Sequence, residues 1–158
     1  MKKTNWKTYV VFVVLTEIVG GISGFLTRKG TKVYQATVRQ PPLSPPGAVF
    51  PIVWSILFAL MGIGAARIWQ APLSTERTQS LRLFFSQLGF NFFWSIIFFN
   101  LQAFGFALLW LAVLWVLIAM MINSFRKVDK LAAVLQIPYL LWVSFAAYLN
   151  FGVWRLNR

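Results

Sequence analysis

The stretch PPLSPPGAVFPIVWSILFALMG, from Pro41 to Gly62, decides how the rest of the chain is arranged. Its two proline pairs end any regular structure before them, and proline suits the first turn of a helix because its missing N–H would lack a partner there. The apolar run that follows continues to about Trp69, which is long enough to cross a bilayer. The sequence therefore predicts a membrane-spanning helix that begins directly after a rigid, proline-rich loop.

Large side chains recur along one face of this predicted helix. Phe50, Trp54, Phe58 and Met61 follow one another at three- and four-residue spacing, so they share one side of the helix. Aromatic rings beside a rigid loop can line an apolar ligand pocket, and they can equally pack in the interior of a helix bundle. The residue types alone leave both interpretations open.

The composition indicates an integral membrane protein. Of the 158 residues, 59% are hydrophobic and only 11% are charged, which is more apolar surface than a soluble domain of this length can bury. We expect a single all-α membrane domain covering residues 1–158 and built as a bundle of five transmembrane helices. The predicted helices are about 9–26, 47–69, 81–101, 106–125 and 131–154, with a lid loop at 27–46.

The chain lacks most side chains that support ordinary catalysis. It has no Cys and no His, and its three acidic residues are Glu17, Glu76 and Asp129. Imidazole, thiolate and grouped carboxylates are therefore missing, so we expect neither a metal site nor a cofactor. The net charge of +12 comes from basic residues between the apolar runs, which fits a lipid bilayer as partner and not nucleic acid.

Five spans place the two termini on opposite sides of the membrane. The N-terminal side collects nine basic residues and the other side collects six, which favours a cytoplasmic N-terminus in a bacterial cytoplasmic membrane. The nine are Lys2, Lys3, Lys7, Arg67, Arg77, Arg82, Arg126, Lys127 and Lys130, and the six are Arg28, Lys29, Lys32, Arg39, Arg155 and Arg158.

Polar side chains inside the predicted spans should face protein or water. Glu17 should point into the bundle and contact a ligand or polar partner, or else lie near enough to one surface to reach water or a basic side chain. Gln87, Asn91 and Ser95 are four residues apart and form a stripe. The stripe can join neighbouring helices by hydrogen bonds, or Asn91 can offer its amide to a ligand.

Two smaller features concern helix packing. Thr16, Gly20 and Gly24 follow a small-xxx-small spacing, which predicts close approach of a neighbouring helix. Pro138 is expected to kink the last span.

The chain resembles the TspO/MBR family, the tryptophan-rich sensory proteins related to translocator proteins and the peripheral-type benzodiazepine receptor. The resemblance rests on the opening motif, on QLGFNFFWSIIFF from Gln87, and on PYLLWVSFAAYLNFGVWRLN from Pro138. These motifs occur in this order in a five-span chain, so the chain resembles a bacterial member of the family.

The resemblance implies a homodimer whose pocket opens toward the loop after the first helix and binds porphyrins and similar flat aromatic ligands. It places ligand-binding residues at Tyr34, Pro45, Trp54, Asn91, Trp142, Ala146 and Leu149, to which the aromatic face adds Phe58. The chain departs from the family at Val33 and Leu43, where tryptophans are usual. It also has Phe151 where the family's sterol motif uses a tyrosine, so sterol binding is doubtful.

Three functions are compatible with these features. The first is a receptor-like membrane protein that binds a tetrapyrrole such as protoporphyrin IX, with a sensing, trafficking or regulatory role. The second is a light- and oxygen-dependent enzyme that degrades protoporphyrin, with Trp54 and Trp142 as its catalytic residues. The third is a porphyrin transporter, although the chain lacks the internal repeats that mark many transporters.

Overall fold

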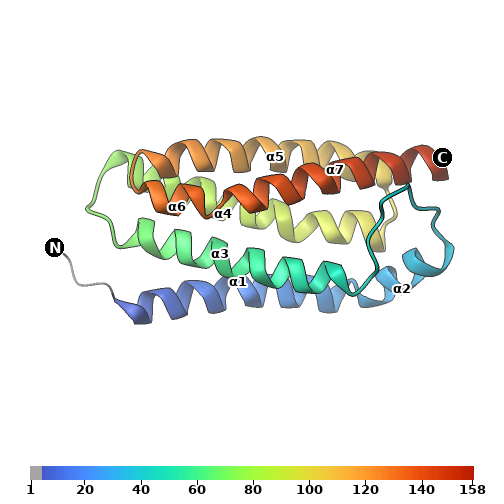
Figure 1. Ribbon diagram of the computed structural model, residues 1–158, viewed down its shortest axis with the longest axis horizontal. Coiled ribbons are helices and arrows are strands. Elements are labelled where there is room, and N and C mark those ends of the chain that lie inside the picture. Colours follow the sequence, from blue (N-terminus) through green and yellow to red (C-terminus); the bar gives the residue numbers. More distant parts are fainter. Residues whose placement is uncertain (1–4) are drawn as a thin grey trace.

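The computed structural model describes residues 5–158, and within this range the fold is all-helical (Figure 1). Five helical segments are long and apolar enough to cross a membrane, as the sequence predicted. They are α1 (Trp6–Leu26), α3 (Val49–Trp69), α4 (Thr75–Ser95) continued by the π-helix η1 (Ile96–Asn100), α5 (Phe104–Arg126), and α6 (Lys130–Val134) followed by α7 (Ile137–Asn157). The remaining helix is α2 (Arg28–Thr37), which lies at the end of the bundle where α7 ends.

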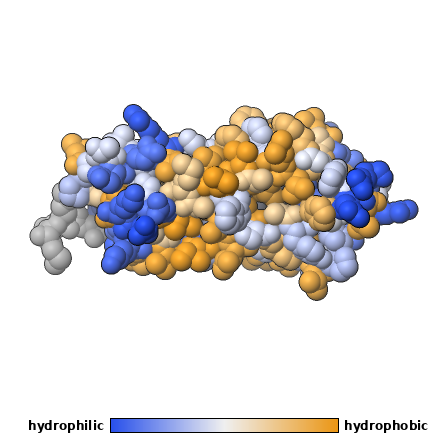
Figure 2. Space-filling model, turned by 90° about the horizontal axis from the view of Figure 1, so that it is seen from above, coloured by the Kyte–Doolittle hydropathy of each residue, from blue (hydrophilic) through white to orange (hydrophobic). Residues whose placement is uncertain are grey.

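The surface has the pattern of a membrane-spanning bundle. On the face shown in Figure 2, apolar side chains cover the middle of the bundle and hydrophilic side chains gather toward both ends. Helix α1 begins at one end of the bundle and α7 ends at the other (Figure 1), as five spans require. Lys2 and Lys3, which entered the prediction of orientation, lie outside the described residues.

Side-chain caps fix where three helices begin. Asn5, Ser74 and Asp129 each accept a hydrogen bond from a backbone N–H in the first turn of α1, α4 and α6, respectively. The cap at Ser74 starts α4 at Thr75, earlier than the predicted residue 81. Asp129 also forms an ion pair with Arg67, at 3.0 Å, which joins the end of α3 to the start of α6.

Small residues let α1 and α3 approach closely. The hydroxyl of Thr16 donates to the carbonyl oxygen of Phe58 at 2.6 Å, and a Cβ placed on Gly20 would lie 2.5 Å from the Phe58 ring. A Cβ on Gly62 would lie 2.6 Å from the Cα of Val13. The predicted close approach of a neighbouring helix therefore occurs at Thr16 and Gly20. It does not occur at Gly24, where a Cβ would meet no atom within 4 Å.

The connection between the first two spans is partly helical, contrary to the predicted lid loop over residues 27–46. Its first part forms α2, and only residues 38–48 are irregular. Asn157 holds this irregular segment through two hydrogen bonds with the backbone of Arg39, at 3.0 and 2.8 Å, and the Tyr148 hydroxyl donates to the carbonyl oxygen of Pro42 at 2.7 Å. The segment is thus fastened to α7 across the end of the bundle.

The last span is interrupted instead of kinked. Helix α6 ends at Val134, a turn follows at Leu135 and Gln136, and Pro138 lies in the first turn of α7. Proline is well tolerated there because its missing N–H needs no partner.

Candidate ligand cavity

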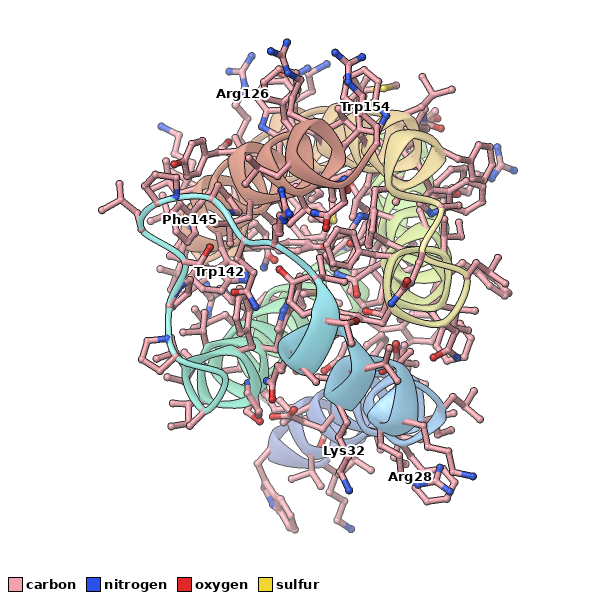
Figure 3. All side chains as sticks on the ribbon, turned by 90° about the vertical axis from the view of Figure 1, so that its right-hand side faces the viewer. Arg28, Lys32, Arg126, Trp142, Phe145 and Trp154 are labelled. Carbon is pink, nitrogen blue, oxygen red and sulfur yellow. The ribbon has the colours of Figure 1, made fainter. Side chains whose placement is uncertain are left out.

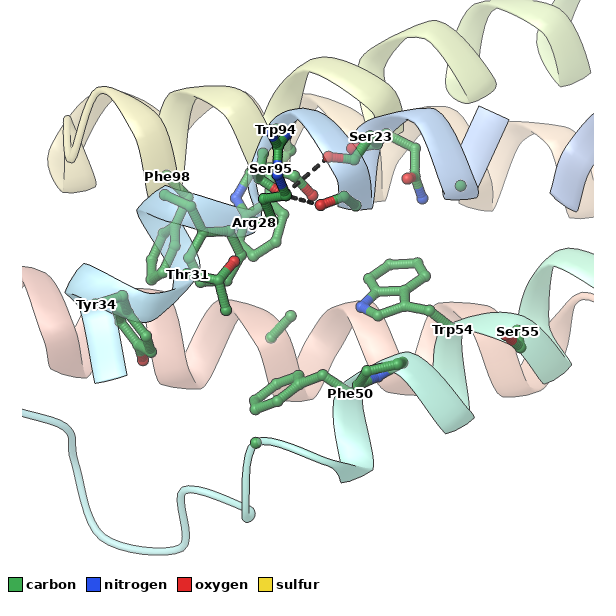
Figure 4. Close-up of a pocket in the computed structure, with 18 of the residues that line it drawn as sticks. Ser23, Arg28, Thr31, Tyr34, Phe50, Trp54, Ser55, Trp94, Ser95 and Phe98 are labelled. Carbon is green, nitrogen blue, oxygen red and sulfur yellow. Dashed lines mark hydrogen bonds between the residues drawn. The ribbon is translucent and has the colours of Figure 1, made fainter. Parts of the chain in front are cut away.

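A cavity of about 570 Å³ lies at the α2 end of the bundle, between α1, α2, α3, α4 with η1, and α7. Figure 4 shows Tyr34, Phe50, Trp54 and Phe98 extending into this space from α2, α3 and η1. A volume of this size falls within the range of sites that bind small organic ligands, about 300–1,000 Å³. The cavity is therefore the candidate binding site.

Seven of the eight residues predicted to bind a ligand line this cavity. They are Tyr34, Trp54, Phe58, Asn91, Trp142, Ala146 and Leu149. The eighth, Pro45, is not in the cavity wall. It belongs to the irregular segment 38–48, which crosses to α7, and the wall is completed instead by Gly47 and Phe50 farther along the chain.

Two tryptophans present indole rings to the cavity from different helices. Trp54 packs against Phe58, with ring centroids 5.6 Å apart, and Trp142 packs edge-on against Phe50 at 6.0 Å. Figure 3 shows Trp142 between α3 and α7, beneath the irregular segment. No side chain or carbonyl oxygen within residues 5–158 accepts a hydrogen bond from either indole N–H. Both donors are therefore available to a bound molecule.

Asn91 lies in the cavity wall and also in a buried hydrogen-bond chain. Its side-chain nitrogen donates to the hydroxyl of Tyr139 at 2.7 Å, and that hydroxyl donates to Oε1 of Gln87, also at 2.7 Å. The Gln87 and Asn91 positions of the predicted stripe thus join α4 to α7, while Ser95 lines the cavity. One N–H of the Asn91 amide is already engaged, which leaves its carbonyl oxygen and its second N–H for a ligand.

Basic side chains lie at the edge of the cavity beside α2. Arg28 and Lys32 line it, and both extend outward from the corner where α1 meets α2 (Figure 3). The Arg28 guanidinium also lies 4.0 Å from the centre of the Phe25 ring. Arg39 does not line the cavity, because its backbone is held against Asn157. The cavity therefore has a positively charged rim.

Tyr34 closes the cavity beneath α2. Its ring packs against Phe98 and Phe99 of η1, with centroid distances of 5.3 and 5.2 Å, and the side chain is only 6% exposed. Burial raises the pKa of the Tyr34 phenol to about 12, so the phenol stays protonated at neutral pH.

Several wall residues were not predicted from the sequence. Trp94 and Phe98 occupy the wall from the end of α4 and from η1. Trp94 donates its indole N–H to Asn150 of α7 at 3.1 Å, which fixes the distance between these helices. The motif WSIIFF contains both residues, but the spacing expected of an α-helix gives no indication of a π-helical turn that redirects the last rings.

Comparison with known proteins agrees with this architecture. The profile of the TspO/MBR family matches residues 12–155. The chain is 36% identical over 154 residues to the tryptophan-rich protein TspO of Chlorobaculum tepidum, covering 95% of this chain and 96% of that protein. It is 37% identical over 120 residues to the tryptophan-rich sensory protein of Cereibacter sphaeroides, covering 76% and 74%. It is also 31% identical over 155 residues to the translocator protein of Bos taurus, covering 97% and 92%. The chain belongs to the TspO/MBR family.

Proposed function

We propose that this protein is a receptor-like membrane protein that binds porphyrins and similar flat aromatic ligands in its cavity, with a sensing, trafficking or regulatory role. The observation that carries the proposal is the convergence of seven predicted ligand residues, from four helices, on one cavity. Aromatic and apolar walls with a few polar groups suit a flat macrocycle. Arg28 and Lys32 at the rim offer charge-assisted hydrogen bonds to its carboxylates.

The cavity favours a metal-free porphyrin over haem bound through its iron. The sequence contains no His or Cys, which are common axial ligands of haem iron. Tyr34 lines the cavity, but burial raises the pKa of its phenol to about 12, which disfavours the phenolate form that ligates iron. We expect tighter binding of free-base protoporphyrin IX than of its iron complex, without the absorption spectrum of histidine-ligated haem.

A porphyrin titration followed by tryptophan fluorescence quenching tests the proposal. The variants are Trp54→Phe, Trp142→Phe and Asn91→Ala, with Trp115→Phe as control because Trp115 lies on α5 outside the cavity wall. We expect Asn91→Ala to weaken binding by about 1 kcal/mol, the scale of one hydrogen bond. The two cavity tryptophan variants should weaken binding and the control should not. Unchanged affinity in all three cavity variants would place the site elsewhere.

The second candidate is photo-oxidative degradation of the porphyrin. It is favoured by the placement of Trp54 and Trp142 in the same cavity wall, where their indoles could act as electron donors or radical carriers beside an excited porphyrin. In this reaction O2 is the oxidant and the porphyrin is oxidised. Illumination of the purified complex in air, with an argon control, tests it. Equal bleaching by wild type, Trp54→Phe and Trp142→Phe would rule out a role for these indoles.

Membrane orientation and assembly complete the proposal. We propose that the protein forms a homodimer in a bacterial cytoplasmic membrane with its N-terminus in the cytoplasm. The chain has no Cys, so single cysteines placed at Leu73 and Leu43, which are both exposed and lie in loops at opposite ends, can be labelled selectively. The Leu43 site should react with an impermeant maleimide on intact spheroplasts and the Leu73 site only after lysis. Light scattering of the purified protein in detergent measures the dimer.

A further inference from the structure

Glu17 is the one acidic side chain that the fold does not explain. Glu76 lies in the first turn of α4, where a negative charge interacts favourably with the helix dipole. Asp129 caps α6 and pairs with Arg67. Glu17 lines the cavity from α1 and, within residues 5–158, has no hydrogen-bond or ion-pair partner.

The position of Glu17 makes the lack of a partner unfavourable. A carboxylate inside a membrane-spanning helix is costly unless a cation or hydrogen-bond donor compensates it. The basic residues of the rim follow the end of α1 at Leu26, which is about 14 Å along the helix axis from Glu17 at 1.5 Å per residue. The protein therefore supplies negative charge at one level of the cavity and positive charge at another.

Two aromatic residues, Phe58 and Trp54, line the same cavity as Glu17. A Cβ placed on Gly20, which is one helical turn from Glu17, would lie 2.5 Å from the ring of Phe58. The ring of Trp54 follows at 5.6 Å from that of Phe58. Aromatic faces attract ammonium groups through the quadrupole of the ring, and the attraction is stronger where water is excluded. A cavity wall that carries a carboxylate and two aromatic rings is a suitable environment for a protonated amine.

We propose that Glu17, with Phe58 and Trp54, binds the protonated amine of an aromatic ligand in this cavity. The inference rests on the proposed function, because it assumes that the cavity is the ligand site. It adds a charge preference to that function. Ligands with a cationic nitrogen are held at Glu17, and anionic groups are held at the rim by Arg28 and Lys32.

Two probes that differ in one group test the preference. (Aminomethyl)pyrene carries an ammonium at neutral pH, and (hydroxymethyl)pyrene has the same rings without the charge. Their affinities are measured by energy transfer from the protein tryptophans in wild type and in Glu17→Gln. Glu76→Gln is the matched control, because it removes the same charge from an exposed position outside the cavity wall.

In wild type we expect the amine to bind about tenfold tighter than the alcohol, as for a charge-assisted contact in a poorly hydrated site. Glu17→Gln should abolish this ratio by weakening binding of the amine more than binding of the alcohol, Glu17→Asp should keep part of it, and Glu76→Gln should keep all of it. A ratio unchanged in Glu17→Gln, or lost equally in Glu76→Gln, would overturn the proposal.

Protoporphyrin IX, titrated in the same preparations, separates this proposal from the proposed function. If protoporphyrin does not bind wild type, or binds Trp54→Phe, Trp142→Phe and Asn91→Ala with unchanged affinity, the proposed function fails. If protoporphyrin and the pyrene alcohol bind and compete but the amine has no advantage, the proposed function stands and the role of Glu17 is refuted.

Discussion

Replacing Tyr139 by phenylalanine tests the hydrogen-bond chain behind the cavity. Tyr139 is fully buried, and its hydroxyl accepts from Asn91 and donates to Gln87, both at 2.7 Å. The substitution keeps the ring and its contact with Trp54, at a centroid distance of 6.2 Å, and removes only the hydroxyl. Two hydrogen bonds are therefore lost from a site where the partners are 5% and 0% exposed and cannot turn to bulk water.

The expected loss is less than the sum of two isolated bonds with their desolvation penalties. Each bond contributes about 0.5–1.5 kcal/mol to stability, and values within membranes lie toward the low end. Asn91 and Gln87 are one turn apart on α4, so the donor and acceptor that remain can bond to each other. We expect a decrease of about 1–2 kcal/mol in the free energy of unfolding.

Unfolding by sodium dodecyl sulfate in mixed micelles, followed by circular dichroism, measures this change. Tyr148→Phe is the matched control, because it also deletes a hydroxyl, at 2.7 Å from the carbonyl oxygen of Pro42, but from an exposed side chain. We expect a loss below about 0.5 kcal/mol for this exposed bond. Equal losses in the two variants would refute the reasoning that burial makes the Tyr139 bonds stabilising.

Three further predictions concern packing, the irregular segment and pH. Gly62→Ala should cost about 1–3 kcal/mol, because its Cβ would lie 2.6 Å from the Cα of Val13, whereas Gly21→Ala, with no atom within 4 Å, should be nearly neutral in the same unfolding assay. Asn157→Ala removes two hydrogen bonds to the segment over the cavity, so porphyrin should dissociate several-fold faster in stopped-flow measurements, and an unchanged rate would exclude a lid role. Burial raises the pKa of Tyr34 from 10.0 to about 12, so the unfolded chain loses its proton first and stability should fall as pH rises from 10 to 12. Tyr34→Phe should show a smaller fall over this range.

The five spans were predictable because each is a long apolar run, and charged residues separate all of them except the third and fourth, which Gln102 separates. The start of the third span was less predictable, because the apolar pattern there begins later than the helix. At the third span, Ser74 followed by Glu76 is a recognisable helix start, and it places the first turn of α4 among polar residues that a hydropathy pattern assigns to a loop.

Helix α2 was predicted as part of a loop for a related reason. The segment is short and rich in Lys and Arg, which suggests a solvated connection. Thr27, Thr31, Tyr34 and Val38 nevertheless recur at three- and four-residue spacing, and this is the face that carries the buried Tyr34. Gly30 permits the close approach of this helix to η1, because a Cβ there would lie 2.6 Å from the carbonyl oxygen of Phe99.

The candidate site was predictable at the level of residues and not of atoms. The sequence identified Asn91 and Glu17 as polar groups inside spans and left their roles open. Only the coordinates show that the Asn91 nitrogen is used by Tyr139, whereas Glu17 has no partner among the described residues. Such assignments depend on contacts between distant segments, which the spacing of residues within one helix does not determine.

The cavity itself follows from the order of residue sizes along α3. The second half of this helix reads MGIGAA, and there the neighbouring helices come close: a Cβ on Gly64 would lie 3.2 Å from the carbonyl oxygen of Ala132. The first half reads VFPIVW, and there α3 meets α7 through large rings, as in the pair formed by Phe50 and Trp142. Helices separated by large rings at one end and by glycine and alanine at the other must diverge toward the large end. The space opened by this divergence lies beneath α2 and the irregular segment. The change in side-chain size along α3 therefore places the cavity at the end of the bundle where those elements can cover it.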